Sequence, residues 1–218
     1  FRPMTAFPLP QPGEVVFLYD SLSPYAFMAS TRIEANAKAL DVNVRWQPVF
    51  LAGLLKAAQN VAPIMGPSAN KARWAQRDAF LQVEALGLAF TWPETFPQNS
   101  VQVMRALVVI EDQEVLVRAT HAAYGVIYGQ GGSLEDTPSL VAAFNKAGLD
   151  GEALMARAAT EEAKSRLRAL TDQAVELGAF GVPDFLVRGK DGETELFFGN
   201  DRLHLALLRA AGRPLTML

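Results

Sequence analysis

Apolar residues follow two different patterns along this chain of 218 residues. Short apolar or alternating runs of strand length occur toward both ends of the chain. They predict strands at residues 14–19, 42–48, 184–188 and 194–198. From about residue 68 to residue 177, apolar residues instead recur at helical spacing and no segment has a convincing strand pattern. The chain is therefore expected to have two strand-containing parts separated by a block of helices.

Helices are expected where apolar residues repeat at helical spacing or where capping residues open a segment. They are predicted at residues 24–40 and 70–86, twice within 100–128, at 137–147, once or twice within 151–177, and at 202–211. Glycine-rich residues 129–133 are typical of a loop, and residues 189–192 of a turn that joins the last two strands into a hairpin.

The order of these elements predicts an α/β fold with a thioredoxin-like sheet. The first strand, helix and second strand form a βαβ unit, which favours parallel strands. The last part of the chain reads strand, strand, helix. Residues 14–62 and 178–218 are together expected to form a thioredoxin-like domain, and residues 63–177 a large all-helical insertion between its two halves.

Composition narrows the classes of function. The net charge is −3 and no block of Lys or Arg occurs, so nucleic acid is not expected as a partner. No apolar run reaches the length of a membrane span, so no membrane partner is expected either. The chain has no cysteine, which rules out disulfides, thiolate metal sites and redox catalysis by a thiol of its own. A cysteine-free chain fits a reducing compartment, and a cytoplasmic location is expected.

Ser23 is the first candidate for chemistry. It stands between the apolar run at 15–19 and Pro24, where it would be the N-cap of a helix that begins at the proline. A helix start has unpaired N–H groups that favour an anion such as a thiolate. Ser23 is therefore either a cap worth about 1 kcal/mol or a hydroxyl donor to the thiolate of a ligand. A serine nucleophile fits less well, since it needs an adjacent general base.

Two further segments have both a structural and a functional interpretation. The Val182-Pro183 bond follows a glycine and precedes a strand, which makes it a candidate cis peptide. It is either an ordinary strand start or a bend that exposes the backbone of Val182 to an extended, peptide-like ligand. Asn200 and Asp201 either cap the last helix or bind the carboxylate and ammonium of an α-amino acid. Together the three segments describe a thiol-containing tripeptide, glutathione.

Four segments of the chain resemble the 2-hydroxychromene-2-carboxylate isomerase family and, more distantly, the kappa-class glutathione transferases. They are residues 17–25 around Ser23, residues 50–60, residues 149–185 with the Gly181-Val182-Pro183 motif, and residues 198–203. The resemblance implies glutathione as the cofactor and Ser23 as the catalytic residue, which hydrogen-bonds its sulfur.

The same resemblance implies further binding residues. Asn60 aligns with a position near the sulfur, and Lys71 with a position that meets the glycine carboxylate. Val182 aligns with the peptide-like contact of the cofactor. The plainer interpretations are a turn for Asn60 and a solvated helix face for Lys71.

Asn200 and Asp201 align with the contacts to the γ-glutamyl end of glutathione. The resemblance also implies a homodimer, in which Asp78 and Arg202 reach glutathione across the interface. Solvated charges on helix faces are the plainer interpretation of Asp78 and Arg202.

Two residues depart from the family pattern, and the first is Ser21, which stands in the opening strand where an apolar residue is common. Asp184 follows the Val-Pro pair where members of the family often have threonine. A carboxylate that points into the groove would disfavour a thiolate there by like-charge repulsion, whereas one that points to solvent would change nothing.

The expected activity is the glutathione-dependent isomerisation of a small aromatic substrate of the hydroxychromene carboxylate type, as in the breakdown of aromatic hydrocarbons. A thiolate adds to the substrate, a bond rotates and the thiol leaves. Tyr25 and Trp74 are expected to cover the substrate. Two alternatives stay open: a kappa-like transferase or peroxidase, and a glutathione-binding module without catalysis.

Overall fold

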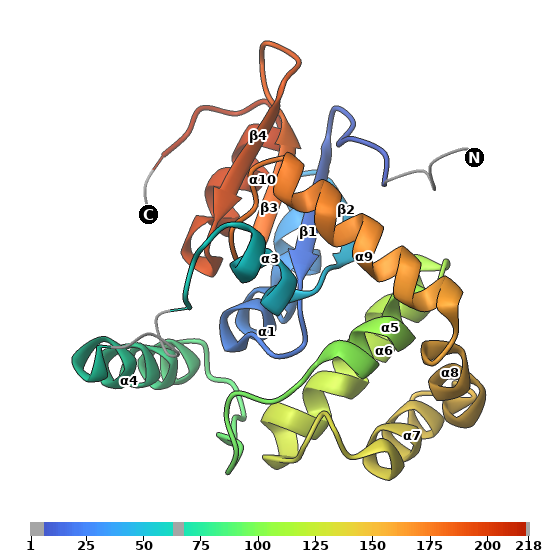
Figure 1. The fold of residues 1–218 in the computed structure, drawn as a ribbon. Helices are drawn as coiled ribbons and strands as arrows, with labels where there is room; N and C mark the ends of the chain where they lie inside the picture. The colour runs from blue at the N-terminus through green and yellow to red at the C-terminus, as the bar shows by residue number, and fades with distance from the viewer. Residues whose placement is uncertain (1–6, 63–67, 217–218) are drawn as a thin grey trace.

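A mixed four-stranded sheet forms the centre of the molecule in this computed structural model, which describes residues 7–62 and 68–216 (Figure 1). The strands are β1 (Glu14–Tyr19), β2 (Asn43–Pro48), β3 (Asp184–Arg188) and β4 (Thr194–Phe198), in the order β2-β1-β3-β4. β1 pairs with β2 in parallel, and the β1–β3 and β3–β4 pairs are antiparallel. The predicted thioredoxin-like fold, with a helical insertion between β2 and β3, is confirmed.

Helices make up the rest of the described secondary structure, and residues 68–177 contain no strand, as expected. The helices that precede β3 in the chain are α1 (Pro24–Ser30), α2 (Ile33–Lys38), α3 (Leu51–Ala57), α4 (Ala69–Ala85), α5 (Val101–Val108), α6 (Gln113–Tyr124), α7 (Thr137–Lys146), α8 (Gly151–Ala158) and α9 (Glu161–Glu176). A π-helical turn (Gly125–Gly129) extends α6, and a 3₁₀ turn (Asn200–Arg202) precedes α10 (Leu203–Ala210). The predicted first residue of the insertion, 63, lies outside the described residues.

One helix prediction was wrong, and one helix was missed. The single helix expected at 24–40 is two helices, because it breaks after Ser30. Ser30 Oγ donates to Phe27 O (2.6 Å) and Thr31 Oγ1 donates to Met28 O (2.9 Å), so hydroxyls compete for carbonyls of the last turn. The prediction also missed α3, although its buried residues Leu51, Leu54 and Leu55 have helical spacing.

One face of the sheet is covered by aromatic packing and by helices from both ends of the chain. The Phe17 ring stacks on Phe185 with 5.5 Å between centroids and meets Trp46 edge-on at 4.9 Å. The Trp46 indole N–H donates to Glu34 of α2, and α10 packs on α2, β1 and β3. The Tyr19 hydroxyl reaches across to Thr120 of α6 at 2.6 Å, so the insertion and the sheet share one core.

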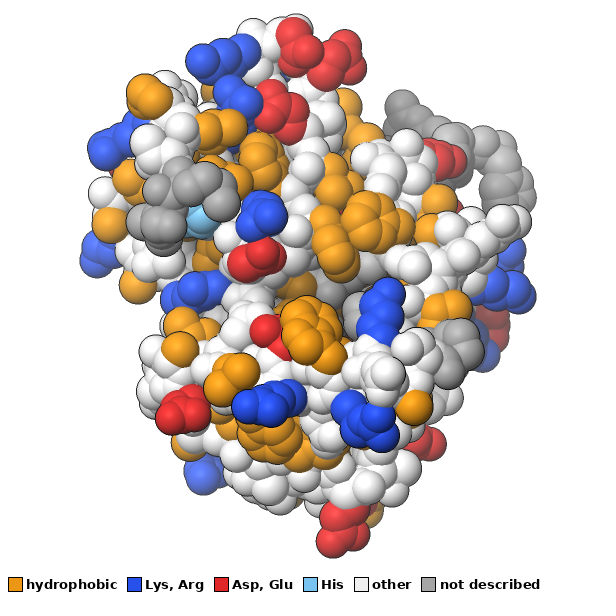
Figure 2. Space-filling view, turned by 90° about the vertical axis from the view of Figure 1, so that its left-hand side faces the viewer, with side chains coloured by type: hydrophobic (Ala, Val, Ile, Leu, Met, Phe, Trp, Pro, Cys, Tyr) orange, Lys and Arg blue, Asp and Glu red, His pale blue; other side chains and the backbone are white. Residues whose placement is uncertain are grey.

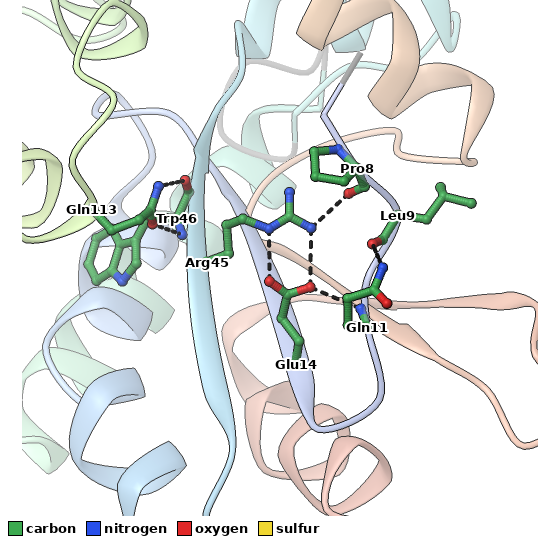
Figure 3. Close-up of polar contacts among 7 residues, drawn as sticks. All are labelled: Pro8, Leu9, Gln11, Glu14, Arg45, Trp46 and Gln113. Carbon is green, nitrogen blue, oxygen red and sulfur yellow. Dashed lines mark hydrogen bonds and ion pairs between the residues drawn. The ribbon is translucent and has the colours of Figure 1, made fainter. Parts of the chain in front are cut away.

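The edge strand β2 is protected by side chains (Figure 3). The Gln113 side chain forms two hydrogen bonds with the backbone of Trp46. Trp46 N donates to Gln113 Oε1 at 2.7 Å, and Gln113 Nε2 donates to Trp46 O at 3.3 Å. Arg45 donates to Glu14 (2.9 Å) and to Pro8 O (2.7 Å), which fastens the segment that leads into β1. The two bonds of Gln113 occupy the backbone N–H and C=O of Trp46, which an exposed strand edge would offer to another chain.

Helix α4 stands out to one side of the molecule, at the lower left of Figure 1 and to the left of α1. Its buried residues Ala79 and Val83 pack against Met28 of α1. The hydroxyl of Tyr25, in the first turn of α1, also donates to Ala75 O of α4 at 3.2 Å, so α4 packs along α1 beside the candidate site. Within the described ranges, none of the helices combines the length and the apolar character that crossing a membrane requires.

Candidate functional site

A cavity of about 450 Å³ lies where α1, α3, α4 and the segment before β3 meet the turn that follows β4. Segments far apart in the sequence contribute to its wall: Ser23, Asn60, Asp78, Val182 and Asn200. Figure 2 views the molecule from the side on which α4 lies and shows hydrophobic side chains gathered around a hollow in this face. The size is typical of pockets for small molecules.

Ser23 is held from two sides at the head of α1. It is the N-cap, as predicted, and its Oγ accepts from Ala26 N at 3.2 Å. The same hydroxyl donates to Val182 O at 3.2 Å. Ser23 is only 5% exposed, yet it lines the cavity. Ser23 therefore caps α1, and the cap places its hydroxyl at the wall of the pocket.

The fully buried carboxylate of Asp20, which was not among the predicted site residues, organises the turn before Ser23. Its Oδ1 accepts from Leu22 N (2.9 Å), and its Oδ2 accepts from Leu51 N (2.8 Å) and Ser100 Oγ (2.9 Å). Its carbonyl accepts from Ser23 N (3.0 Å). Burial raises the pKa of Asp20 to about 6, against the opposing effect of these hydrogen bonds. The only signal in the sequence was an acid directly after a buried strand.

The Val182-Pro183 bond is cis, as predicted, and enters β3 beside the cavity. The expectation that both backbone groups of Val182 are free was wrong for the carbonyl, because Ser23 Oγ occupies it. Among the described residues, the Val182 N–H has no hydrogen-bond partner. A Cβ at Gly181 would lie 2.9 Å from the Phe198 ring, so a larger residue there would push this ring aside. One backbone donor of this segment is therefore available to a ligand in the pocket.

Asp184 points neither into the cavity nor to solvent. It is 0% exposed and does not line the cavity. Because Phe185 stacks on Phe17, alternation along β3 directs Asp184 to the opposite face of the sheet. Neither carboxyl oxygen has a hydrogen-bond partner among the described residues. Burial raises the pKa of Asp184 to about 9, so the group is neutral at pH 7 and places no charge beside a thiolate.

The cavity has a polar end formed by side chains from three elements. The expected capping role of Asn200 was wrong: its Oδ1 accepts from Arg32, and its Nδ2 donates to Gln82 Oε1 at 2.7 Å. Gln82 Nε2 in turn donates to Asp78 Oδ2 at 2.7 Å, and Tyr25 OH donates to the same oxygen at 2.9 Å. Asp78, Gln82, Tyr25 and Asn200 all line the cavity. Asp78, which was expected to reach glutathione across a dimer interface, therefore lines the cavity that contains Ser23 of its own chain.

The remaining predicted residues are divided between the cavity and the surface. Asn60 lines the cavity and donates to Phe180 O at 3.0 Å. Asp201 also lines it and forms an ion pair of 2.8 Å with Arg202, which itself lies outside the lining. Lys71 is exposed in the first turn of α4, outside the lining.

Apolar side chains form much of the rest of the cavity lining. Leu51 and Leu55 come from α3, Trp74 from α4, and Phe96 and Phe198 from segments outside these helices. Trp74 is 61% exposed, an unusual position for so large an apolar ring. Trp74 was expected near the mouth, whereas Phe96 and the α3 leucines carried no signal in the sequence, because they look like ordinary core residues. The wall suits an apolar or aromatic group.

The sheet, the inserted helices and the cis-proline beside the head of α1 define a thioredoxin-like protein. The chain belongs to the family of DSBA-like thioredoxin domains, whose family model matches residues 14–209. In the part of the chain that the structure describes, no cluster of His, Cys, Asp or Glu is arranged to hold a metal ion.

Individual relatives span nearly the whole chain. Glutathione S-transferase kappa 1 from Homo sapiens is 28% identical over 206 residues, which cover 90% of each chain. The 2-hydroxychromene-2-carboxylate isomerase from Pseudomonas putida is 26% identical over 201 residues, covering 91% of this chain and 94% of the relative. A solved structure of 2-hydroxychromene-2-carboxylate isomerase superposes with a TM-score of 0.74 at 23% identity, covering 88% of this chain and 91% of that one.

Proposed function

We propose that this protein is an enzyme that binds glutathione in the cavity beside Ser23. The observation that carries the proposal is the convergence of three different groups on one cavity. These are a hydroxyl at Ser23, a backbone N–H at Val182 that has no partner within residues 7–62 and 68–216, and carboxylates at Asp78 and Asp201. They match a thiol, a peptide group and an ammonium, all of which glutathione contains. Relatives named kappa glutathione S-transferases support the same ligand.

Ser23 is the proposed catalytic residue, because its hydroxyl is the polar group at the head of α1. Ala26 N–H holds the oxygen in place, while the hydroxyl hydrogen is free to rotate from Val182 O toward a ligand. Glutathione, when bound, would supply the thiolate that adds to the substrate and later leaves. The hydroxyl would stabilise the negative charge on sulfur, and the apolar wall would contact the substrate and exclude water.

The proposed reaction is the isomerisation of an aromatic substrate of the 2-hydroxychromene-2-carboxylate type. The Pseudomonas putida relative that carries this name matches the chain over 94% of its own length. Trp74, Phe96 and Phe198 offer aromatic surface to such a substrate in the same cavity. The substrate would lie between these rings and the Ser23 hydroxyl.

A second candidate is a kappa-like glutathione transferase, which the 28% identity to the human kappa enzyme favours. Both activities need the same activated thiolate, and they differ in whether the sulfur stays on the product. Disulfide exchange by a thiol of this chain is excluded, because the chain has no cysteine to form the mixed disulfide. The homodimer stays a prediction, which sedimentation of the purified protein would test.

Two parallel assays test the proposal and separate the candidates. The protein is incubated with glutathione and a 2-hydroxychromene-2-carboxylate in one assay, and with glutathione and an electrophilic aryl halide in the other. We expect isomer to form in the first without consumption of glutathione, and none to form when glutathione is omitted. A conjugate in the second assay without isomer in the first would favour the transferase. Glutathione binding by calorimetry with neither activity would leave only a binding module.

A further inference from the structure

The hydrogen bonds at the polar end of the cavity have a defined direction. An arginine side chain has only donors, so Arg32 turns the Asn200 amide with its oxygen toward the guanidinium. The Asn200 Nδ2 must then face Gln82, which accepts it at Oε1. Gln82 consequently presents Nε2 to Asp78 Oδ2, at 2.7 Å. Along this series of hydrogen bonds, from Arg32 through Asn200 and Gln82, each N–H donor therefore points toward the Asp78 carboxylate.

Gln82 is the member that joins two distant parts of the sequence. It lies on α4, within the inserted segment, while its partner Asn200 lies in the turn before α10. With Tyr25 of α1 as the second donor, Asp78 Oδ2 is fixed from both sides. The amide of Gln82 thereby orients the Asn200 side chain on one wall and the Asp78 carboxylate on the other.

We infer that Gln82 is a positioning residue for the charged amino end of the ligand. The inference rests on the proposed binding of glutathione. Asp78 and Asp201 are the carboxylates among the residues that line the cavity, and an ammonium is the ligand group that they would hold. Gln82 offers this ammonium no charge of its own. It acts by holding Asp78 at the wall and by tying α4 to the end of the cavity that Asn200 and Asp201 form.

The test combines a protein variant with a ligand variant. Gln82→Met removes both hydrogen bonds and keeps the length of the side chain. Gln76→Met changes an exposed glutamine on the same helix, outside the cavity, and serves as the matched control. Calorimetry measures the affinity of each protein for glutathione and for glutathione acetylated on its α-amino group. Thermal unfolding of each variant checks that the fold is retained.

We expect Gln82→Met to weaken glutathione binding about tenfold or more, as the loss of hydrogen bonds around a charged group does. Acetylation should weaken binding to the wild-type protein as well. The substitution and the acetylation should weaken the same interaction, so their effects on affinity should not add. Gln82→Met and the wild type should therefore bind the acetylated ligand within about twofold of each other. In turnover, the variant should raise KM for glutathione and leave kcat at saturating glutathione unchanged. Gln76→Met should match the wild type throughout.

Two results would overturn the inference while leaving glutathione binding intact. One is a Gln82→Met protein that binds glutathione as the wild type does. The other is an equal loss for both ligands, which would make Gln82 a general packing residue. A wild-type protein that takes up no glutathione at millimolar concentration would instead overturn the proposed function, and the inference with it.

Discussion

Ser23 combines two roles that are usually assigned to different residues. Its oxygen caps α1 through Ala26 N–H, and its hydrogen is donated to Val182 O at the wall of the cavity. The first role stabilises the fold, and the second leaves the hydroxyl next to the proposed position of the ligand sulfur. Variants that separate stability from turnover can therefore distinguish the two roles.

Ser23→Ala is expected to lower turnover by about 10²–10³, as the loss of one stabilising donor does in other enzymes. It should also cost about 1 kcal/mol of stability through the lost cap. Steady-state kinetics and urea unfolding measure the two effects. Thr160→Ala is the matched control, because Thr160 caps α9 in the same way, at 3.2 Å from Ala163 N, and lies outside the cavity. Equal turnover in the two variants would reduce Ser23 to a cap.

The buried carboxyl of Asp184 should make the stability of the fold depend on pH. Its folded pKa of about 9 lies above the ordinary value of 3.8, so the folded state binds this proton more tightly than the unfolded state. Its contribution to stability is therefore complete below the unfolded pKa and is lost as the pH rises toward about 9. Between pH 6 and pH 8 the loss approaches about 1.4 kcal/mol per pH unit.

Asp184→Asn should remove this slope, because an amide does not titrate. Urea unfolding of both proteins at pH 6, 7 and 8 measures the difference. Asp172→Asn, at an exposed position on α9, should keep the wild-type slope. Parallel curves for the wild type and Asp184→Asn would show that the buried carboxyl does not take up a proton in the folded state.

At the scale of elements, Asp20 is the junction of three segments. The turn before α1, the first residue of α3 and the residue before α5 all donate to its carboxylate. Two of these donors are the backbone N–H groups of Leu22 and Leu51, both of which are buried residues. The bonds place α3, which carries Leu51 and Leu55, on the cavity side of the turn that holds Ser23.

Asp20→Ala is expected to cost about 3 kcal/mol or more, because it leaves two buried N–H groups unpaired. Ser100→Ala removes only the hydroxyl donor and should cost about 1 kcal/mol. Urea unfolding compares the two variants with the wild type. If both variants lost the same stability, the backbone donors of Leu22 and Leu51 would have found other partners and the junction would not depend on Asp20.

At the scale of the whole molecule, the cavity is a junction between the two sequence-distant parts of the fold. Residues of α1, α3 and the segments around β3 and β4 form one side, and α4 of the insertion forms the other. A ligand that contacts both sides binds the folded chain and not the unfolded one. Its binding free energy is then added to the stability of the whole fold.

Glutathione at 100 times its dissociation constant should raise the free energy of unfolding by about 2.7 kcal/mol. Thermal unfolding with increasing glutathione measures this effect as a rising Tm. Cysteinylglycine, which lacks the γ-glutamyl group, is the ligand control and should raise Tm less at the same concentration. A Tm that does not respond to glutathione would contradict the proposed binding.

The sequence was most informative where interactions are local. The four strands, the Ser23 cap with Pro24 and the cis bond before Pro183 were all predicted, since each depends on the residues next to it. The break after Ser30 was missed because it depends on competing hydroxyl bonds within the turn. Of the predicted binding residues, Asn60, Val182, Asn200 and Asp201 line the cavity, and Lys71 and Arg202 do not.

Residue patterns alone were enough to predict the order and type of most elements, the absence of a thiol in the chain, and the position of Ser23 at the start of a helix. Hydrophobic periodicity and helix capping act within one or two turns, so they can be read from neighbouring residues. The burial of Asp184 in the core, and the bonds by which Asp20 and Gln82 connect separate segments, were visible only in the three-dimensional fold. Hydrogen-bond partners and burial depend on which distant segments the fold brings together, and no local pattern specifies them.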